Sequence, residues 1–421
     1  MANGGDNLPK GIVGAWLLHH DQKLLNSKTT SFENIALAGR ASRLLSVVSK
    51  EDESNVSNER VGELANGIGI RRLEIKGLLV ELEEQGLVAQ GKSGVTVLGV
   101  TQARLLDHAA DIFDSQEPDG LELAAIDLAE RGSHSPLRRS DCEEELSDTY
   151  ELSEAEMDDL FSQSEHIGFI DYENSGVDRL YFNGSLFKRD QAQKAKRILE
   201  SLTTEERERL IHVDSLLKAQ GCLLAAAVRQ LLGDSLWSKM HQIGYFEVSI
   251  VSNERGPTEF VTKPEALTKF VPGGLADVLD DAKALASSLT YGIVKSSDTR
   301  GRIKDPSALI NALIGRGFVE GWAPAIRQDY QILERRNVVQ VTSSSQGHRL
   351  TLLKPEIGEM AKDLILRGDA SGTAAEMIIG TQAAQFYGPE AARSAERDRK
   401  KDVPEAKTAT SRALNVLRRT N

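Results

Sequence analysis

Arginine and glutamine side chains that could read DNA bases stand close together between Ile326 and Arg335. Arg can form paired hydrogen bonds with guanine in the major groove, and Gln can do the same with adenine. If the apolar residues spaced i, i+4 and i+7 face a core, the polar ones point outward. The apolar set is Ile326, Tyr330 and Leu333, and the polar set is Arg327, Gln328 and Gln331, followed by Arg335. This pattern predicts a DNA-contacting helix face. The alternative is an exposed, solvated face.

Further basic residues lie on both sides of that helix in the sequence. Arg300, Arg302 and Lys304 precede it, and His348 and Arg349 follow it. Contacts from such side chains to phosphate oxygens position a protein on a duplex without reading its sequence. Residues 291–355 contain ten Lys/Arg and five Asp/Glu, a local charge of +5. We therefore expect phosphate contacts in this part of the chain.

A second basic group lies nearer the amino terminus. It consists of Arg71, Arg72 and Lys76 at the start of a predicted helix, and Lys92 in the turn that follows. The same helix carries four glutamates that would repel phosphate unless they face away, namely Glu74, Glu81, Glu83 and Glu84. We expect nucleic-acid contact here as well, with a weaker electrostatic basis.

One predicted helix, residues 153–163, points to a different partner. It carries four acidic residues and no basic one: Glu154, Glu156, Asp158 and Asp159. Such a helix is repelled by DNA phosphates, so we expect it to face a protein or to act as a spacer. The surrounding residues 114–165 hold 17 acidic and three basic side chains, a local charge of −14, whereas the whole chain carries −12. The alternative is a solvated acidic segment that keeps the protein soluble.

Catalytic motifs are missing, since the sequence has no His-Glu-x-x-His and no Gly-x-Ser-x-Gly. The pattern Gly-x-x-x-x-Gly-Lys-Ser/Thr occurs once, at residues 86–93, but it covers the apolar strand and polar turn of the first copy. A phosphate-binding loop instead joins a strand to a helix. His19 and His20 precede Asp21 without partner ligands at helical or finger spacing, so we expect them to be surface histidines. Two cysteines are too few for a disulfide framework or a four-cysteine zinc site. We therefore predict a non-enzymatic protein without a cofactor or a metal.

The expected location is the cytoplasm, and no membrane is expected as a partner. Two cysteines in 421 residues fit a reducing compartment. Residues 1–6 lack the basic and apolar regions of a signal peptide. No apolar run approaches the roughly 20 residues needed to span a bilayer.

The elements that would position these residues recur four times along the chain. Each copy has a helix, a Gly or Asn break, an apolar strand, a small polar turn and a second strand. The four helix ends and hairpins lie at residues 82–98, 163–182, 240–262 and 333–352. A unit that recurs at a fixed spacing is typical of a modular array.

The repeated helix and two-stranded hairpin resemble the second half of a winged helix. This resemblance implies a mainly α fold with small antiparallel β-wings, in which the third helix of each module docks on the partner and the wing lies on the nucleic-acid backbone. The expected parts are an N-terminal arm (1–29), a first module (30–113), an acidic second module (114–187), a third module (188–270), a basic fourth module (271–366) and a helical or flexible basic tail (367–421).

Two functions follow from this resemblance. The first is a DNA-binding regulator or DNA-organising protein whose end modules hold duplex DNA, while the acidic module spaces them or recruits a protein. The second is a scaffold or accessory subunit that binds protein through the acidic module or the C-terminal tail. The third module is too neutral to assign, and Trp237 is expected in its core.

Overall fold

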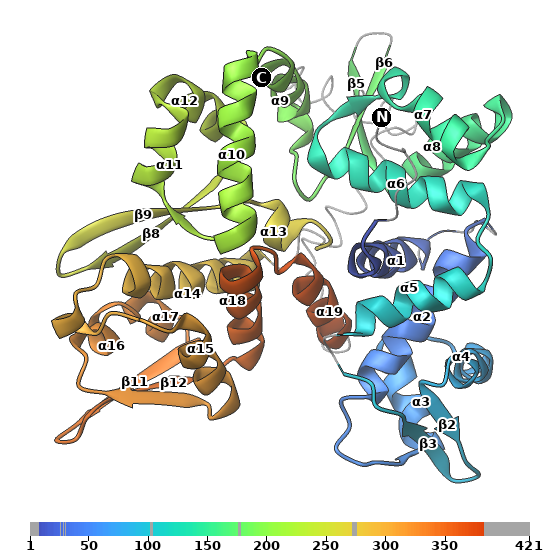
Figure 1. Cartoon of the computed structure of the whole chain (residues 1–421). Coiled ribbons are helices and arrows are strands. Elements are labelled where there is room, and N and C mark those ends of the chain that lie inside the picture. The colour runs from blue at the N-terminus through green and yellow to red at the C-terminus, as the bar shows by residue number, and fades with distance from the viewer. Residues whose placement is uncertain are drawn as a thin grey trace, which may run out of the picture. The chain divides into compact units, whose positions relative to one another are not determined.

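Small antiparallel sheets are joined by helices throughout the chain (Figure 1). The computed structural model describes residues 8–382, except 26, 28, 30, 102, 103, 176, 177 and 272–275. Over these residues the strands form four three-stranded sheets, with the orders β1-β3-β2, β4-β6-β5, β7-β9-β8 and β10-β12-β11. In each sheet the last two strands make a hairpin, and the first strand pairs with the hairpin's second strand. The prediction of a mainly helical chain with small antiparallel sheets is confirmed.

The first copy follows the predicted order closely. Its elements are α2 (Glu33–Val48), β1 (Val56–Ser57), α3 (Asn58–Gly67), α4 (Arg72–Glu84), β2 (Val88–Gln90) and β3 (Gly94–Val97). The Ser57 side chain accepts a hydrogen bond from the Arg60 backbone N–H and so caps α3. Gly86 adopts a φ of 67° after α4, a left-handed conformation that glycine takes without a Cβ penalty. Local signals therefore account for the start of α3 and the end of α4.

Gly77 offers a test of the helical assignment of α4. It lies inside the helix on the exposed side, and a Cβ added there would meet no atom within 4 Å. Glycine in a helix interior is less favourable than alanine by about 0.8–1 kcal/mol. We expect Gly77→Ala to raise the free energy of unfolding by about 0.5–1 kcal/mol, measured by urea denaturation. A lower denaturation midpoint would contradict this assignment.

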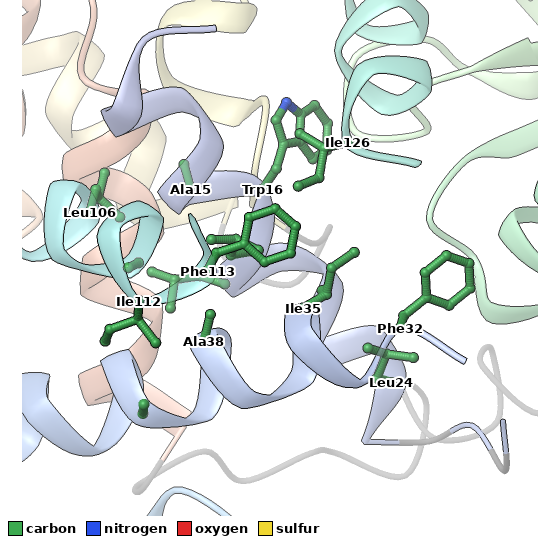
Figure 2. Close-up of a cluster of buried hydrophobic side chains, with 14 of the residues drawn as sticks. Ala15, Trp16, Leu24, Phe32, Ile35, Ala38, Leu106, Ile112, Phe113 and Ile126 are labelled. Carbon is green, nitrogen blue, oxygen red and sulfur yellow. The ribbon is translucent and has the colours of Figure 1, made fainter. Parts of the chain in front are cut away.

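The N-terminal arm predicted for residues 1–29 does not hold for its described part. Residues 10–24 form helix α1 (Lys10–Leu24), which packs against α2 and α5 (Leu105–Ser115). Figure 2 shows Trp16 of α1 in the same apolar cluster as Ile35 of α2 and Phe113 of α5. The apolar run Ala15 to Leu18 is at most 1% exposed. Burial of this run explains why α1 belongs to the core.

The prediction that His19 and His20 lie at the surface is wrong. Both are buried, and the His20 ring stacks on Phe169 with centroids 3.9 Å apart. Burial lowers the pKa of His20 to about 3, so this imidazole is neutral at ordinary pH. The neighbouring Asp21 accepts a hydrogen bond from the buried Arg43 at 2.6 Å. Histidines that follow an apolar run on a core helix are core residues here.

The second copy shares its core with the first. Its elements are α6 (Gly120–His134), β4 (Leu137–Arg138), the 3-10 helix η2 (Arg139–Asp141), α7 (Glu143–Tyr150), α8 (Glu154–Ile167), β5 (Asp171–Ser175) and β6 (Asp178–Phe182). Ser153 and Glu156 form a capping box at the start of α8. Met157, Phe161 and Ile167 of α8 belong to the same buried cluster as α1 and α2. The predicted boundary at residue 114 is therefore not a break in the core. Gly176 of the predicted turn lies outside the described residues.

The third copy has a long hairpin. Helix α9 (Arg189–Glu200) precedes it, and its own elements are α10 (Thr204–Gln220), β7 (Leu223–Leu224), α11 (Ala225–Leu232), α12 (Asp234–Gln242), β8 (Glu247–Asn253), β9 (Gly256–Thr262) and α13 (Glu265–Thr268). The hairpin predicted within residues 240–262 is present and turns at residues 253–256. Thr203 forms a capping box with Glu206 at the start of α10. Trp237 is partly buried against the core of this copy, as expected.

The fourth copy differs from prediction in its helices. It comprises α14 (Ala276–Val294), the 3-10 helix η3 (Asp298–Arg300), α15 (Pro306–Gly315), β10 (Phe318–Gly321), α16 (Pro324–Gln328), α17 (Gln331–Arg335), β11 (Val339–Ser344) and β12 (Gly347–Leu352). The single helix predicted over residues 324–335 is divided, because Tyr330 leaves helical geometry (φ −114°, ψ 13°) and is buried.

Two helices follow the fourth hairpin. They are α18 (Pro355–Arg367) and α19 (Ser371–Gln382), and the remainder of the predicted tail lies outside the described residues. Ala374 of α19 belongs to the core of the fourth copy, whereas Ala375 and Ile379 belong to the core of the first two copies. Helix α19 thus contacts both cores. Among the described helices, none has the length and apolar character needed to cross a membrane.

Candidate nucleic-acid interface

The predicted basic residues of the fourth copy meet around one end of its sheet. In the pairing of β10 with β12, Gly321 lies opposite His348, and Glu320 lies opposite Arg349. The loop that carries Arg302 is close by, because a Cβ on Gly301 would overlap the Cβ of Ala323. Helix α16, with Arg327, packs on β12. We name the exposed or partly exposed residues Arg302, Lys304, Arg327, His348 and Arg349 the fourth basic surface.

Ion pairs reduce the free charge of the fourth basic surface. Arg349 pairs with Glu320, and its guanidinium lies over the Phe318 ring, 4.3 Å from the centroid. Lys304 lies 3.4 Å from Asp298, with both side chains largely exposed. Arg302 and Arg327 have no carboxylate partner among the described residues, although Arg302 donates to the Ile293 carbonyl at 3.2 Å. These two arginines are the best placed to meet phosphate.

Arg300 does not belong to this surface. Its side chain is only 4% exposed, and it donates to Asp329 at 2.6 Å and to Glu254 at 2.7 and 3.1 Å. The hydrogen bonds that Arg300 donates to Asp329 and then to Glu254 raise its pKa, against the lowering effect of burial. The predicted phosphate contact by Arg300 does not fit this burial, because its guanidinium already binds two carboxylates.

The hairpin of the third copy supplies one of those carboxylates. Glu254 lies at its tip, where Asn253 also donates to Asp329 at 2.9 Å. Gln328 lies against the same Glu254 carboxylate, to which its amide nitrogen donates at 2.8 Å when turned toward it. The hairpin runs along α14 (Figure 1), with Phe260 and Tyr291 in edge contact. Gln328 and the third hairpin are therefore both engaged in contacts with other parts of the same chain.

Gln331 and Arg335 lie on the exposed side of α17, four residues apart. Arg335 has no ion pair among the described residues, whereas the adjacent Arg336 pairs with Asp281 at 2.5 Å. Leu333 between them is fully buried. The predicted division into inner apolar and outer polar residues therefore holds for Gln331, Leu333 and Arg335, although α17 is a single short turn.

In the first copy the predicted basic residues are all exposed. Arg72 and Lys76 are one turn apart on α4, and Lys92 lies in the hairpin turn. None of these three forms an ion pair with another described residue. Arg71 is also exposed but lies 3.4 Å from Glu74, which in turn binds Arg40 at 2.6 Å. Glu74 is thus drawn inward, and Glu81 is buried.

The acidic residues predicted on α8 are exposed and point to a different surface. Glu154, Glu156, Asp158 and Asp159 all lie on its outer side. Asp158 accepts a hydrogen bond from Arg139 at 2.6 Å, and Glu156 closes the capping box at the start of the helix. Glu154 and Asp159 have no basic partner among the described residues. Helix α8 thus presents net negative charge.

An exposed tryptophan in the fourth copy escaped prediction. Trp322 follows β10 directly and is 69% exposed, whereas Trp16 is 1% exposed. The sequence signal was its position immediately after an apolar strand and among basic residues. No hydropathy or charge pattern distinguishes such a residue from a core tryptophan.

The comparisons with known proteins add no family to this description. No family model matches the chain, and the searches of curated proteins and of solved structures find no match. Within the described residues, no group of three or more His, Cys, Asp or Glu side chains is placed to hold a metal ion.

Proposed function

We propose that the chain is an array of four winged-helix modules that binds duplex DNA through its first and fourth modules, without catalysis. The order helix, strand, two helices and hairpin supports the winged-helix assignment, as does a first strand paired with the hairpin's second strand in every sheet. Such modules place a helix in the major groove and a hairpin on the backbone.

One observation carries the choice of modules. Among the described residues, the two helices before the hairpin carry exposed Lys or Arg side chains without an ion pair only in the first and fourth copies. These side chains are Arg72 and Lys76 in the first copy, and Arg327 and Arg335 in the fourth. In the second copy α8 is acidic, and in the third the hairpin tip is engaged by Arg300 and Asp329. Two weak contacts on one chain would reinforce each other through their effective concentration.

Paired substitutions test this proposal. The first-module pair is Arg72→Gln with Lys76→Gln, and the fourth-module pair is Arg302→Gln with Arg327→Gln. We expect each pair to weaken duplex binding by about tenfold or more at moderate salt, since phosphate contacts dominate affinity. The measurement is fluorescence anisotropy of a labelled duplex with the full chain. The control pair Lys194→Gln with Arg229→Gln removes the same charge from exposed positions outside both modules.

Equal losses in all three pairs would assign the effect to net charge and would contradict the proposed interface. A full chain that binds no duplex even at low salt would overturn DNA binding altogether. In that case the exposed acidic face of α8 would favour the second candidate function, a scaffold that binds a basic protein surface.

If the full chain does bind duplex DNA, its role would be that of a regulator or a DNA-organising component.

A further inference from the structure

We propose that Trp322 is a base-stacking platform, so that the fourth module prefers DNA with an accessible base face, at a duplex end or a junction with single strand, over uninterrupted duplex. This inference rests on the proposed function, because it concerns the ligand of the same surface. It deepens that function by naming the DNA structure that is bound.

The indole is held at a defined place beside the hairpin. Trp322 directly follows Gly321, which lies opposite His348 in the sheet. The turn residue Gly347 is buried with a φ of 118°, and a Cβ there would lie 3.4 Å from Cδ2 of Trp322 and 2.8 Å from the Gly321 carbonyl oxygen. Glycine thus allows the hairpin backbone to approach the ring closely. The ring is supported on this side while the residue remains 69% exposed.

The surroundings favour a nucleic acid as the partner of this ring. The flanking residues of the fourth basic surface include Arg302 and Arg327, neither of which has a carboxylate partner among the described residues. A polyanion would satisfy these charges while an aromatic base covers the indole. Base–aromatic stacking combined with a basic groove is the usual basis of single-strand binding.

The stacking geometry excludes the interior of an intact duplex as the preferred target. Paired bases inside a duplex are stacked on both faces, and opening one step costs a few kcal/mol. A terminal or unpaired base presents its face at little cost. The ligand class that suits both the indole and the arginines is therefore duplex DNA adjoining a free end or single strand.

The experiment compares two DNA probes with the full chain at one salt concentration. The first is a short duplex with a single-stranded 3′ overhang, and the second is relaxed, covalently closed circular DNA, which has no ends. We expect the overhang probe to bind about tenfold tighter per binding site than the closed circle. Trp322→Leu should reduce this preference to within about twofold and leave binding to the closed circle unchanged. Trp322→Phe should retain part of the preference.

Ile332→Ala serves as a matched control, because Ile332 is an apolar residue of the same module that is 50% exposed. It should leave the preference intact. Two results would overturn the stacking proposal alone. They are equal binding to the closed circle and the overhang probe, and a preference for the overhang that survives Trp322→Leu. Either result would assign the indole to a protein partner. Binding to neither probe would overturn the proposed function as well. Quenching of tryptophan emission by the overhang probe, lost in Trp322→Phe, is the expected spectroscopic sign.

Discussion

Replacing Arg300 with methionine is expected to lower the free energy of unfolding by about 3–5 kcal/mol, the usual cost of breaking a buried ion pair. The Arg300 guanidinium forms ion pairs with Asp329, which is 3% exposed, and with Glu254 at the tip of the third hairpin. It also receives support from Ser296, to which it donates at 3.0 Å. Its removal leaves the Asp329 carboxylate buried, with the Asn253 amide as its one remaining donor among the described residues. Urea denaturation, followed by circular dichroism, measures the loss.

Arg302→Met is the matched control, since it makes the same change at an exposed position two residues away. Surface substitutions of this kind usually change stability by no more than about 0.5 kcal/mol. Asp329→Asn added to Arg300→Met should recover part of the lost stability by removing the unpaired charge. If Arg300→Met unfolds at the same urea concentration as Arg302→Met, the pair does not stabilise the junction of the third and fourth copies.

The second large effect concerns the pH dependence of stability. Glu376 lies on α19, where burial raises its pKa from 4.5 to about 8, against the attraction of Lys50 and with repulsion from Asp363 and Asp107. Because the folded pKa exceeds the unfolded one, the folded chain keeps this proton where the unfolded chain has lost it. The contribution of Glu376 to the free energy of unfolding is therefore fully present below about pH 4.5 and is lost as the pH rises toward 8. The slope approaches about 1.4 kcal/mol per pH unit within that window.

Glu376→Gln keeps the shape of the protonated side chain and removes the titration. We expect the variant to match the wild type near pH 5 and to exceed its stability by several kcal/mol near pH 8. The buried His20 titrates with the opposite sign at lower pH, but it contributes equally to both proteins and cancels in their difference. Glu208→Gln, at an exposed helical position, is the control. A pH-independent difference between wild type and Glu376→Gln would show that the carboxyl is ionised in the folded protein.

The hairpins and helix ends could be predicted because their determinants are local. Gly86 and Gly168 end α4 and α8 with φ of 67° and 85°, and serine and threonine capping boxes start α8 and α10. Turn residues at 253–256 then set the register of the strands beside them. Each of these signals acts within a few residues, so a single sequence carries it.

Long-range contacts decided what could not be predicted. His19 and His20 are polar by type, yet α1 is buried by α2, α5 and α6, which follow it in the chain. Arg300 resembles Arg302 in sequence, and only its distance from Glu254 and Asp329 distinguishes a buried junction residue from a surface one. The place of Trp322 is likewise set by a contact with a later strand, since the Gly347 backbone lies close to its ring. Charge pattern alone therefore placed the basic regions but not each residue within them.

The salt dependence of duplex binding tests the central proposal most directly. The measurement compares the full chain with a variant carrying Gln at Arg72, Lys76, Arg302 and Arg327, and with a control carrying Gln at Lys194, Lys218, Arg229 and Arg255. The slope of log affinity against log salt should become shallower by about one for each lost phosphate contact, and thus by about four in the first variant. It should stay close to the wild-type value in the control. Equal slopes for the first variant and the wild type would contradict DNA binding by the first and fourth modules.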